Sequence, residues 1–172
     1  MSLDICASFL RRAGLQNPSV KDGVNAIKAI PHGRPRERSA AGVVADWRGT
    51  CSTKLLLLRQ VCPGLRLRFF NRVFRLTPEA ARENLGAQVA KVIPTDGMID
   101  VHTYARALID GRWLLIDLAF PGQAWDGTSD MKQPFAQGEH FEAGDDPIAH
   151  KEALVAKFGD AKARARLIEA IS

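Results

Sequence analysis

The sequence predicts a single α+β domain over residues 1–172, with a cysteine-bearing helix in its core and an antiparallel sheet. A leucine-rich segment, residues 51–62, has the composition of a buried helix. Two β-rich segments, residues 101–109 and 112–120, flank an Asp-Gly dipeptide, which is preferred in tight type I′ hairpin turns. A length of 172 residues, 46% of them hydrophobic, fits one globular domain with its own core.

The other elements follow from helical periodicity, capping residues and turn signals. Leu3 and Cys6 begin an apolar helical face that ends before Gly14, and Thr77 with Pro78 is typical of a helix start. The pattern predicts helices over residues 3–13, 20–30, 78–86, 147–158 and 160–171, a strand over 65–76, a turn at 94–97, and loops at 31–38 and 121–146.

Charge and composition narrow the classes of function. The chain has 24 basic and 19 acidic residues, a net charge of +5 concentrated in residues 32–38 and 66–75. A basic surface favours anionic partners, but this excess is modest, so nucleic acid is not the expected partner. No apolar run is long enough for a membrane span, and the N-terminus lacks the pattern of a secretory signal. We therefore expect a cytoplasmic protein.

The cysteines do not form a structural framework. Cys6, Cys51 and Cys62 are an odd, sparse set without zinc-ligand spacing, which is typical of a reducing compartment. The four histidines also lack ligand spacing, and no glycine-rich phosphate loop is present. We expect neither a metal ion nor a cofactor, and one thiol remains available for chemistry.

Cys51 is the thiol with the most suitable position. Thr50 is a good N-cap, which places Cys51 in the first turn of its helix, where the helix dipole favours a thiolate. Lys54 is expected to add positive charge, and Gly49 to permit close approach of a substrate backbone. The alternative for Cys51 by itself is a core cysteine at a helix start.

The hairpin supplies two further candidates. With a two-residue Asp-Gly turn, residue 109 pairs with 112, so Tyr104 lies opposite Asp117 and His102 opposite Ala119. His102 and Asp117 then become diagonal neighbours on one face of the sheet. Asp117 also interrupts an apolar run, where a carboxylate needs a partner. The turn therefore predicts a His–Asp pair, although an isolated strand histidine more often has only a local hydrogen bond.

The order of these residues resembles that of bacterial transglutaminase-like proteins. The resemblance lies in residues 49–54 (Gly-Thr-Cys-Ser-Thr-Lys), 101–104 (Val-His-Thr-Tyr) and 113–117 (Trp-Leu-Leu-Ile-Asp). It implies that Cys51 is the nucleophile, His102 the general base and acid, and Asp117 the residue that orients the histidine. It also implies a papain-like fold, in which the cysteine helix packs on an antiparallel β-sheet with flanking helices.

Some features depart from the family pattern. Leu55 stands where relatives often carry a histidine, and the Cys51 N–H is the natural first oxyanion donor. Trp47, Asn25 and Gln16 are candidates for the second donor. Arylamine acetyltransferases share the Cys-His-Asp order, but they are longer and carry an Arg-Gly-Gly lead-in that is only half matched here.

The sequence thus predicts a cysteine-dependent acyl-transfer enzyme that forms a thioester on Cys51. Its expected substrates are peptides, proteins or small acyl compounds. Hydrolysis of an amide or related bond is favoured over cross-linking, because water needs no second binding site. The alternative is a non-catalytic binding module on the same fold with a basic surface for protein or nucleic acid. Nothing in the sequence indicates an oligomeric state.

Overall fold

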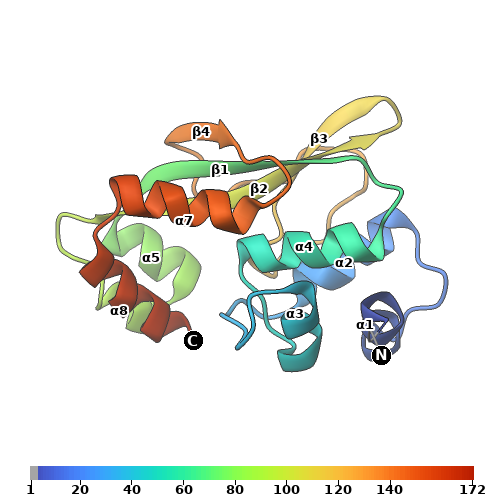
Figure 1. Cartoon of the computed structure of the whole chain (residues 1–172), viewed down its shortest axis with the longest axis horizontal. Coiled ribbons are helices and arrows are strands. Elements are labelled where there is room, and N and C mark those ends of the chain that lie inside the picture. Colours follow the sequence, from blue (N-terminus) through green and yellow to red (C-terminus); the bar gives the residue numbers. More distant parts are fainter. Residues whose placement is uncertain (1–3) are drawn as a thin grey trace. The chain divides into compact units, whose positions relative to one another are not determined.

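The structure, a computed structural model, describes residues 4–172, which form an α+β fold of eight helices and one antiparallel sheet (Figure 1). The order of strands across the sheet is β3-β2-β1-β4. The elements are α1 (Ile5–Ala13), α2 (Val20–Ala29), α3 (Ala40–Asp46), α4 (Cys51–Val61), β1 (Leu67–Leu76), α5 (Pro78–Leu85), α6 (Ala87–Ala90), β2 (Met98–Ile109), β3 (Arg112–Ile116), β4 (Glu139–Glu142), α7 (Pro147–Phe158) and α8 (Ala161–Ile171).

The fold divides into two compact units. Unit 1 contains the chain up to Leu67 together with Tyr104–Met131, and therefore holds α1–α4 and the β2–β3 hairpin turn. Unit 2 contains Arg68–Thr103 and Lys132–Ser172, which include most of β1, strand β4 and helices α5–α8. The expected single domain over residues 1–172 stays a prediction.

Helix α4 is the central helix of unit 1. It contacts α1, α2 and α3, and Figure 1 shows it beside α2 and α3. Leu55, Leu57 and Leu58 are fully buried, as the four consecutive leucines predict. The helix is therefore apolar around most of its circumference, and this burial dominates its stability. Helix α1 is followed by Gly14, which has the left-handed φ of 69° expected of a C-cap. Leu3, with which the apolar face of this helix was predicted to begin, lies outside the described residues.

The turn of the predicted hairpin and the register of its first five pairs are confirmed; the predicted pairs Tyr104–Asp117 and His102–Ala119 lie beyond the end of the ladder. Strands β2 and β3 pair from Ile109 with Arg112 to Ala105 with Ile116, the register that the two-residue turn predicts. Asp110 and Gly111 have φ values of 49° and 77°, as a type I′ turn requires.

The extent of the second strand is a correction. The sequence predicted a strand over residues 112–120, but β3 ends at Ile116. The next residue, Asp117, donates its backbone N–H to Met131 Sδ (3.3 Å) and accepts the N–H of Ala119 on its own carboxylate (3.1 Å). These bonds replace the ladder and turn the chain, because a short carboxylate competes for nearby backbone donors.

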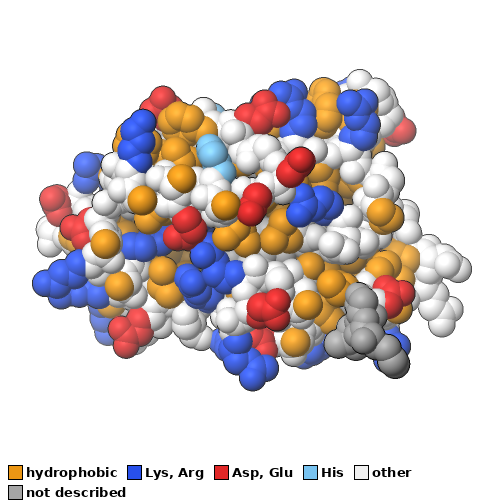
Figure 2. Space-filling view, viewed as in Figure 1, with side chains coloured by type: hydrophobic (Ala, Val, Ile, Leu, Met, Phe, Trp, Pro, Cys, Tyr) orange, Lys and Arg blue, Asp and Glu red, His pale blue; other side chains and the backbone are white. Residues whose placement is uncertain are grey.

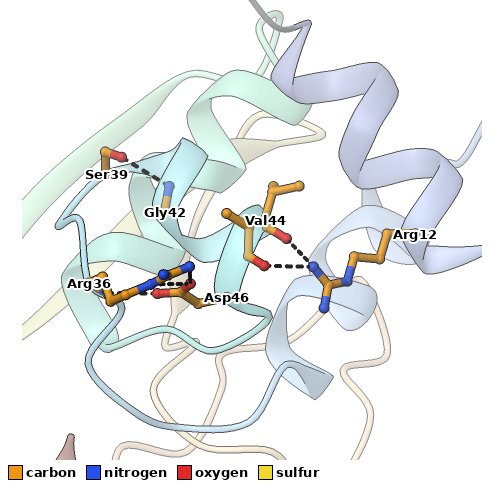
Figure 3. Close-up of polar contacts among 7 residues, drawn as sticks. Arg12, Arg36, Ser39, Gly42, Val44 and Asp46 are labelled. Atoms are coloured by element: carbon orange, nitrogen blue, oxygen red, sulfur yellow. Dashed lines mark hydrogen bonds and ion pairs between the residues drawn. The ribbon is translucent and has the colours of Figure 1, made fainter.

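Helix α3, just before the cysteine segment, was not predicted. Ser39 caps it by accepting the N–H of Gly42, and the carboxylate of Asp46 accepts hydrogen bonds from the backbone and guanidinium of Arg36 (Figure 3). The guanidinium of Arg12 in α1 donates to the carbonyls of Val44 and Ala45 (Figure 3). A seven-residue helix of small residues has no marked hydrophobic period, so these distant contacts stabilise it.

Unit 2 contains two further elements that the sequence did not predict, the four-residue helix α6 and the four-residue strand β4. Strand β4 pairs antiparallel with β1, from Phe70 opposite Glu142 to Val73 opposite Glu139. The predicted helices α7 and α8 are present, and the buried Asn71 amide of β1 donates to the carbonyl of Pro147 at the start of α7 (3.1 Å). In residues 4–172, no helix has the length and apolar character needed to cross a membrane.

Candidate active site

Cys51 lies in the first turn of α4, as predicted, and its side chain is buried, with 6% of the residue exposed. The N-cap Thr50 has an extended backbone, with φ −88° and ψ 173°. Its N–H donates to Thr53 Oγ1 (2.9 Å), which fixes the entry of the chain into the helix. Backbone N–H groups of a first turn have no acceptor within the helix, and together with the helix dipole they stabilise a thiolate at this position.

Lys54, one turn after Cys51, is fully buried. Its ammonium donates to three backbone carbonyls: Ile30 (2.5 Å), Ala119 (3.2 Å) and Lys28 (3.3 Å). Burial, followed by the positive charge of Lys28, lowers the pKa of Lys54 to about 7. The sequence predicted only a positive field here; the structure shows a lysine that joins α4 to the end of α2 and to the segment after β3.

Asp117, in the segment after β3, is buried and belongs to the same unit as Cys51. The negative charges of a Cys51 thiolate and of Asp117 both act on Lys54 and raise its pKa, against the larger effect of burial. The two predicted residues, distant in the chain, thus act on one buried ammonium group.

His32 also belongs to this region, although the sequence predicted an exposed basic loop for it. Its Nδ1 donates to the carbonyl of Ala119 (3.1 Å), and its ring lies 4.6 Å from that of Phe120. An isolated parallel β-bridge pairs His32 with Gly49 and so joins the loop of His32 to the residues just before Cys51. No periodicity or motif in the sequence marks this histidine, because its partners are backbone groups far along the chain.

Gly49 has a structural role that the sequence did not indicate, and its expected role in substrate approach stays a prediction. A Cβ atom at this position would lie 2.7 Å from Lys54 Cγ and 3.2 Å from Val43 Cγ2. The space on the Cβ side of Gly49 is therefore filled by the protein itself. The glycine is needed because the buried stem of Lys54 passes against it.

Gly49→Ala is expected to lower the free energy of unfolding by about 1–3 kcal/mol, because the added methyl group overpacks a buried contact. Gly64→Ala is the matched control, since a Cβ at Gly64 meets nothing within 4 Å. Urea unfolding of the two variants measures the difference. Equal stability would show that the Lys54 stem adjusts freely.

His102 lies on β2 in the part of the strand that belongs to unit 2, and 4% of the residue is exposed. Its ring makes a T-shaped contact with Phe135 at a centroid distance of 5.4 Å, and Phe135 stacks on Phe74 at 4.5 Å. The side chain is thus held in an aromatic environment. Cys51 and Asp117 belong to unit 1, so the contacts of His102 with these two residues stay predictions.

Two of the three candidates for a second oxyanion donor have structural partners. The Asn25 side chain accepts the N–H of Trp125 (2.7 Å) and donates to its carbonyl (3.0 Å). Trp47 stacks on Phe9, with the guanidinium of Arg12 above its ring. Gln16, the third candidate, is exposed.

The basic stretches are largely engaged with other parts of the protein. Arg36 and Arg68 form ion pairs with Asp46 and Glu142, both at 2.7 Å. On the face shown in Figure 2, basic and acidic side chains are interspersed. In residues 4–172, no group of three or more His, Cys, Asp or Glu side chains is placed to hold a metal ion.

Comparisons with models of protein families, with curated proteins and with solved structures find no match to this chain. The resemblance to transglutaminase-like proteins therefore remains an expectation from the motifs, and so does the papain-like identity of the α+β fold.

Proposed function

We propose that this protein is a cysteine-dependent enzyme that transfers the acyl group of an amide or related substrate to Cys51. The observation that carries the proposal is the arrangement in unit 1: a buried cysteine in the first turn of α4, and a buried carboxylate, Asp117, with both charges acting on Lys54. A helix N-terminus and a nearby ammonium are the surroundings that convert a thiol into a nucleophile.

The proposed reaction has two steps. His102 accepts the Cys51 proton, and the thiolate attacks the acyl carbon, with the developing oxyanion stabilised by the Cys51 N–H. The carbon–nitrogen bond then breaks, the imidazolium gives its proton to the leaving amine, and a thioester remains. Water, deprotonated by His102, attacks the thioester to release the acid and restore the thiol. Asp117 keeps the imidazole in the required tautomer and stabilises the imidazolium.

Hydrolysis is favoured over transfer to a second amine. Transfer to an amine requires a second binding site for that amine, whereas water needs none. Peptides, proteins and small acyl compounds remain the proposed substrate classes.

The proposal predicts that iodoacetamide labels Cys51 well before Cys6 or Cys62 at mildly acidic pH. Burial raises the pKa of the Cys62 thiol, so this cysteine is an internal control with a small thiolate fraction. Mass spectrometry of peptides from the labelled protein measures all three rates in one sample.

The same experiment on His102→Ala tests the base. Labelling of Cys51 is expected to slow about tenfold for each unit by which the thiol pKa rises, while Cys6 and Cys62 keep their rates. Three equal rates in the wild type, unchanged in the variant, would exclude an activated nucleophile and favour a non-catalytic module.

A further inference from the structure

Lys54 makes more connections than the proposed reaction requires of a simple positive charge. Its three acceptors come from two places: Lys28 and Ile30 at the end of α2, and Ala119 in the segment after β3. An ammonium has three N–H donors, so this set matches it one to one. An ammonium group buried without hydrogen-bond partners would destabilise the fold. The three specific hydrogen bonds of Lys54 offset this cost of burial.

The carbonyl of Ala119 links this lysine to Asp117. The N–H of Ala119 donates to the Asp117 carboxylate (3.1 Å), while its carbonyl accepts from Lys54 (3.2 Å) and from His32 (3.1 Å). Ala119 therefore connects the Asp117 carboxylate to α4, the helix that carries Cys51. Lys28 adds a second link, because its ammonium donates to the carbonyl of Phe120 (2.9 Å).

We infer that Lys54 is a positioning residue for the reaction of Cys51: its ammonium fastens the Asp117-bearing segment to the first turn of α4. This inference rests on the proposed function, in which Asp117 and Cys51 belong to one catalytic group. Lys54 touches neither substrate nor the reacting bond in this role. It keeps the carboxylate at a constant place relative to the helix that presents the thiol.

The charges around Lys54 couple its protonation to the reaction. The groups that face it are Lys28 from α2, Cys51 on α4 and Asp117 after β3, with His32 sharing the Ala119 carbonyl. A thiolate at Cys51 raises the pKa of Lys54, so a protonated Lys54 favours the thiolate to the same extent. Above pH 7, the amine retains two donors for three carbonyls, and the link weakens.

The first test uses no thiol chemistry. In protein with ¹³C-labelled lysine, NMR titration is expected to show the Lys54 pKa about one unit lower in Asp117→Asn than in the wild type, because a neighbouring negative charge is lost. Asp130→Asn is the control. The Asp130 carboxylate lies in the same unit and accepts the Leu115 N–H, whereas the charges that act on Lys54 are those of Lys28, Cys51 and Asp117. An unchanged Lys54 pKa in Asp117→Asn would overturn the inference.

The second test measures the effect on Cys51. Lys54→Met keeps most of the length of the side chain and removes its charge and donors. We expect iodoacetamide labelling of Cys51 at neutral pH to slow about tenfold, with the midpoint of its pH profile about one unit higher. Lys21→Met, which removes an exposed lysine of α2, is expected to keep the rate within about twofold.

The outcomes separate the two proposals. Fast labelling of Cys51 in the wild type together with an unchanged pH profile in folded Lys54→Met would overturn the role of Lys54 and leave the proposed function standing. Slow labelling of Cys51 in the wild type would overturn both. If Lys54→Met does not fold, the NMR titration of Asp117→Asn decides the question.

Discussion

Asp117→Asn is expected to leave the protein folded while removing most of the reactivity of Cys51. The amide retains an oxygen that can accept the Ala119 N–H, so the turn after β3 persists with a modest loss of stability. It cannot stabilise an imidazolium, and its NH₂ group favours the wrong tautomer of His102 in the proposed triad. Iodoacetamide labelling at neutral pH should slow by roughly 10–100-fold, with circular dichroism as the check on folding.

Two companion variants define what this result means. Asp130→Asn should label at the wild-type rate, because that carboxylate accepts a hydrogen bond from the backbone N–H of Leu115 on β3. Asp117→Leu tests whether the buried carboxylate destabilises the apolar segment around it. A more stable but unreactive protein would show that Asp117 serves function at a cost in stability. Full reactivity of Cys51 in both Asp117 variants would remove Asp117 from the triad and make Asp100, two residues before His102 on β2, the next candidate.

Arg72→Met should have the largest effect on stability in unit 2. Arg72 is 2% exposed, and its guanidinium donates to the carbonyl of Phe135, to Gln133 Oε1 (2.5 Å) and to His140 Nε2 (3.3 Å). Methionine leaves these acceptors without their donor, at a cost of about 3–5 kcal/mol. We expect the melting temperature to fall by roughly 10 °C.

Arg75→Met is the matched control on the same strand. Arg75 is exposed and donates to the carbonyl of Asp96, so its loss should change the free energy of unfolding by less than about 0.5 kcal/mol. Because Phe135 packs on His102, the Arg72 variant should also shift the ring resonances of His102 in NMR spectra. Equal melting temperatures for the two variants would show that the buried contacts of Arg72 contribute no net stability.

The role of Asp117 was only half visible in the sequence. Its position in an apolar run predicted a carboxylate in need of a partner, and the hairpin register confirms the alignment from Ile109 to Ala105. The sequence did not indicate that β3 would end at Ile116, four residues before the predicted end of the strand and one residue before Asp117. Hydrogen bonds of Asp117 to Met131 and Ala119 end the strand. A strand-propensity scale does not account for side chains that take backbone groups away from the hydrogen-bond ladder of the sheet.

What the sequence determined by itself is local. The Asp-Gly dipeptide specifies a type I′ turn because only a few residues tolerate two successive positive φ values, and the turn then sets the pairing of β2 with β3. Thr50 before the leucine run specifies where α4 begins, and therefore places Cys51 in its first turn. Such features depend on residues that are adjacent in the sequence, so they can be predicted from the sequence alone.

Tertiary structure alone decided the surroundings of that thiol. The acceptors of Lys54 are the carbonyls of Lys28, Ile30 and Ala119, and every residue has a carbonyl, so no side-chain pattern marks these three. The need for glycine at position 49 arises in the same way, from the stem of Lys54 packed against it. Backbone groups become specific partners only when distant segments fold together, because their recognition depends on position in space and not on residue type.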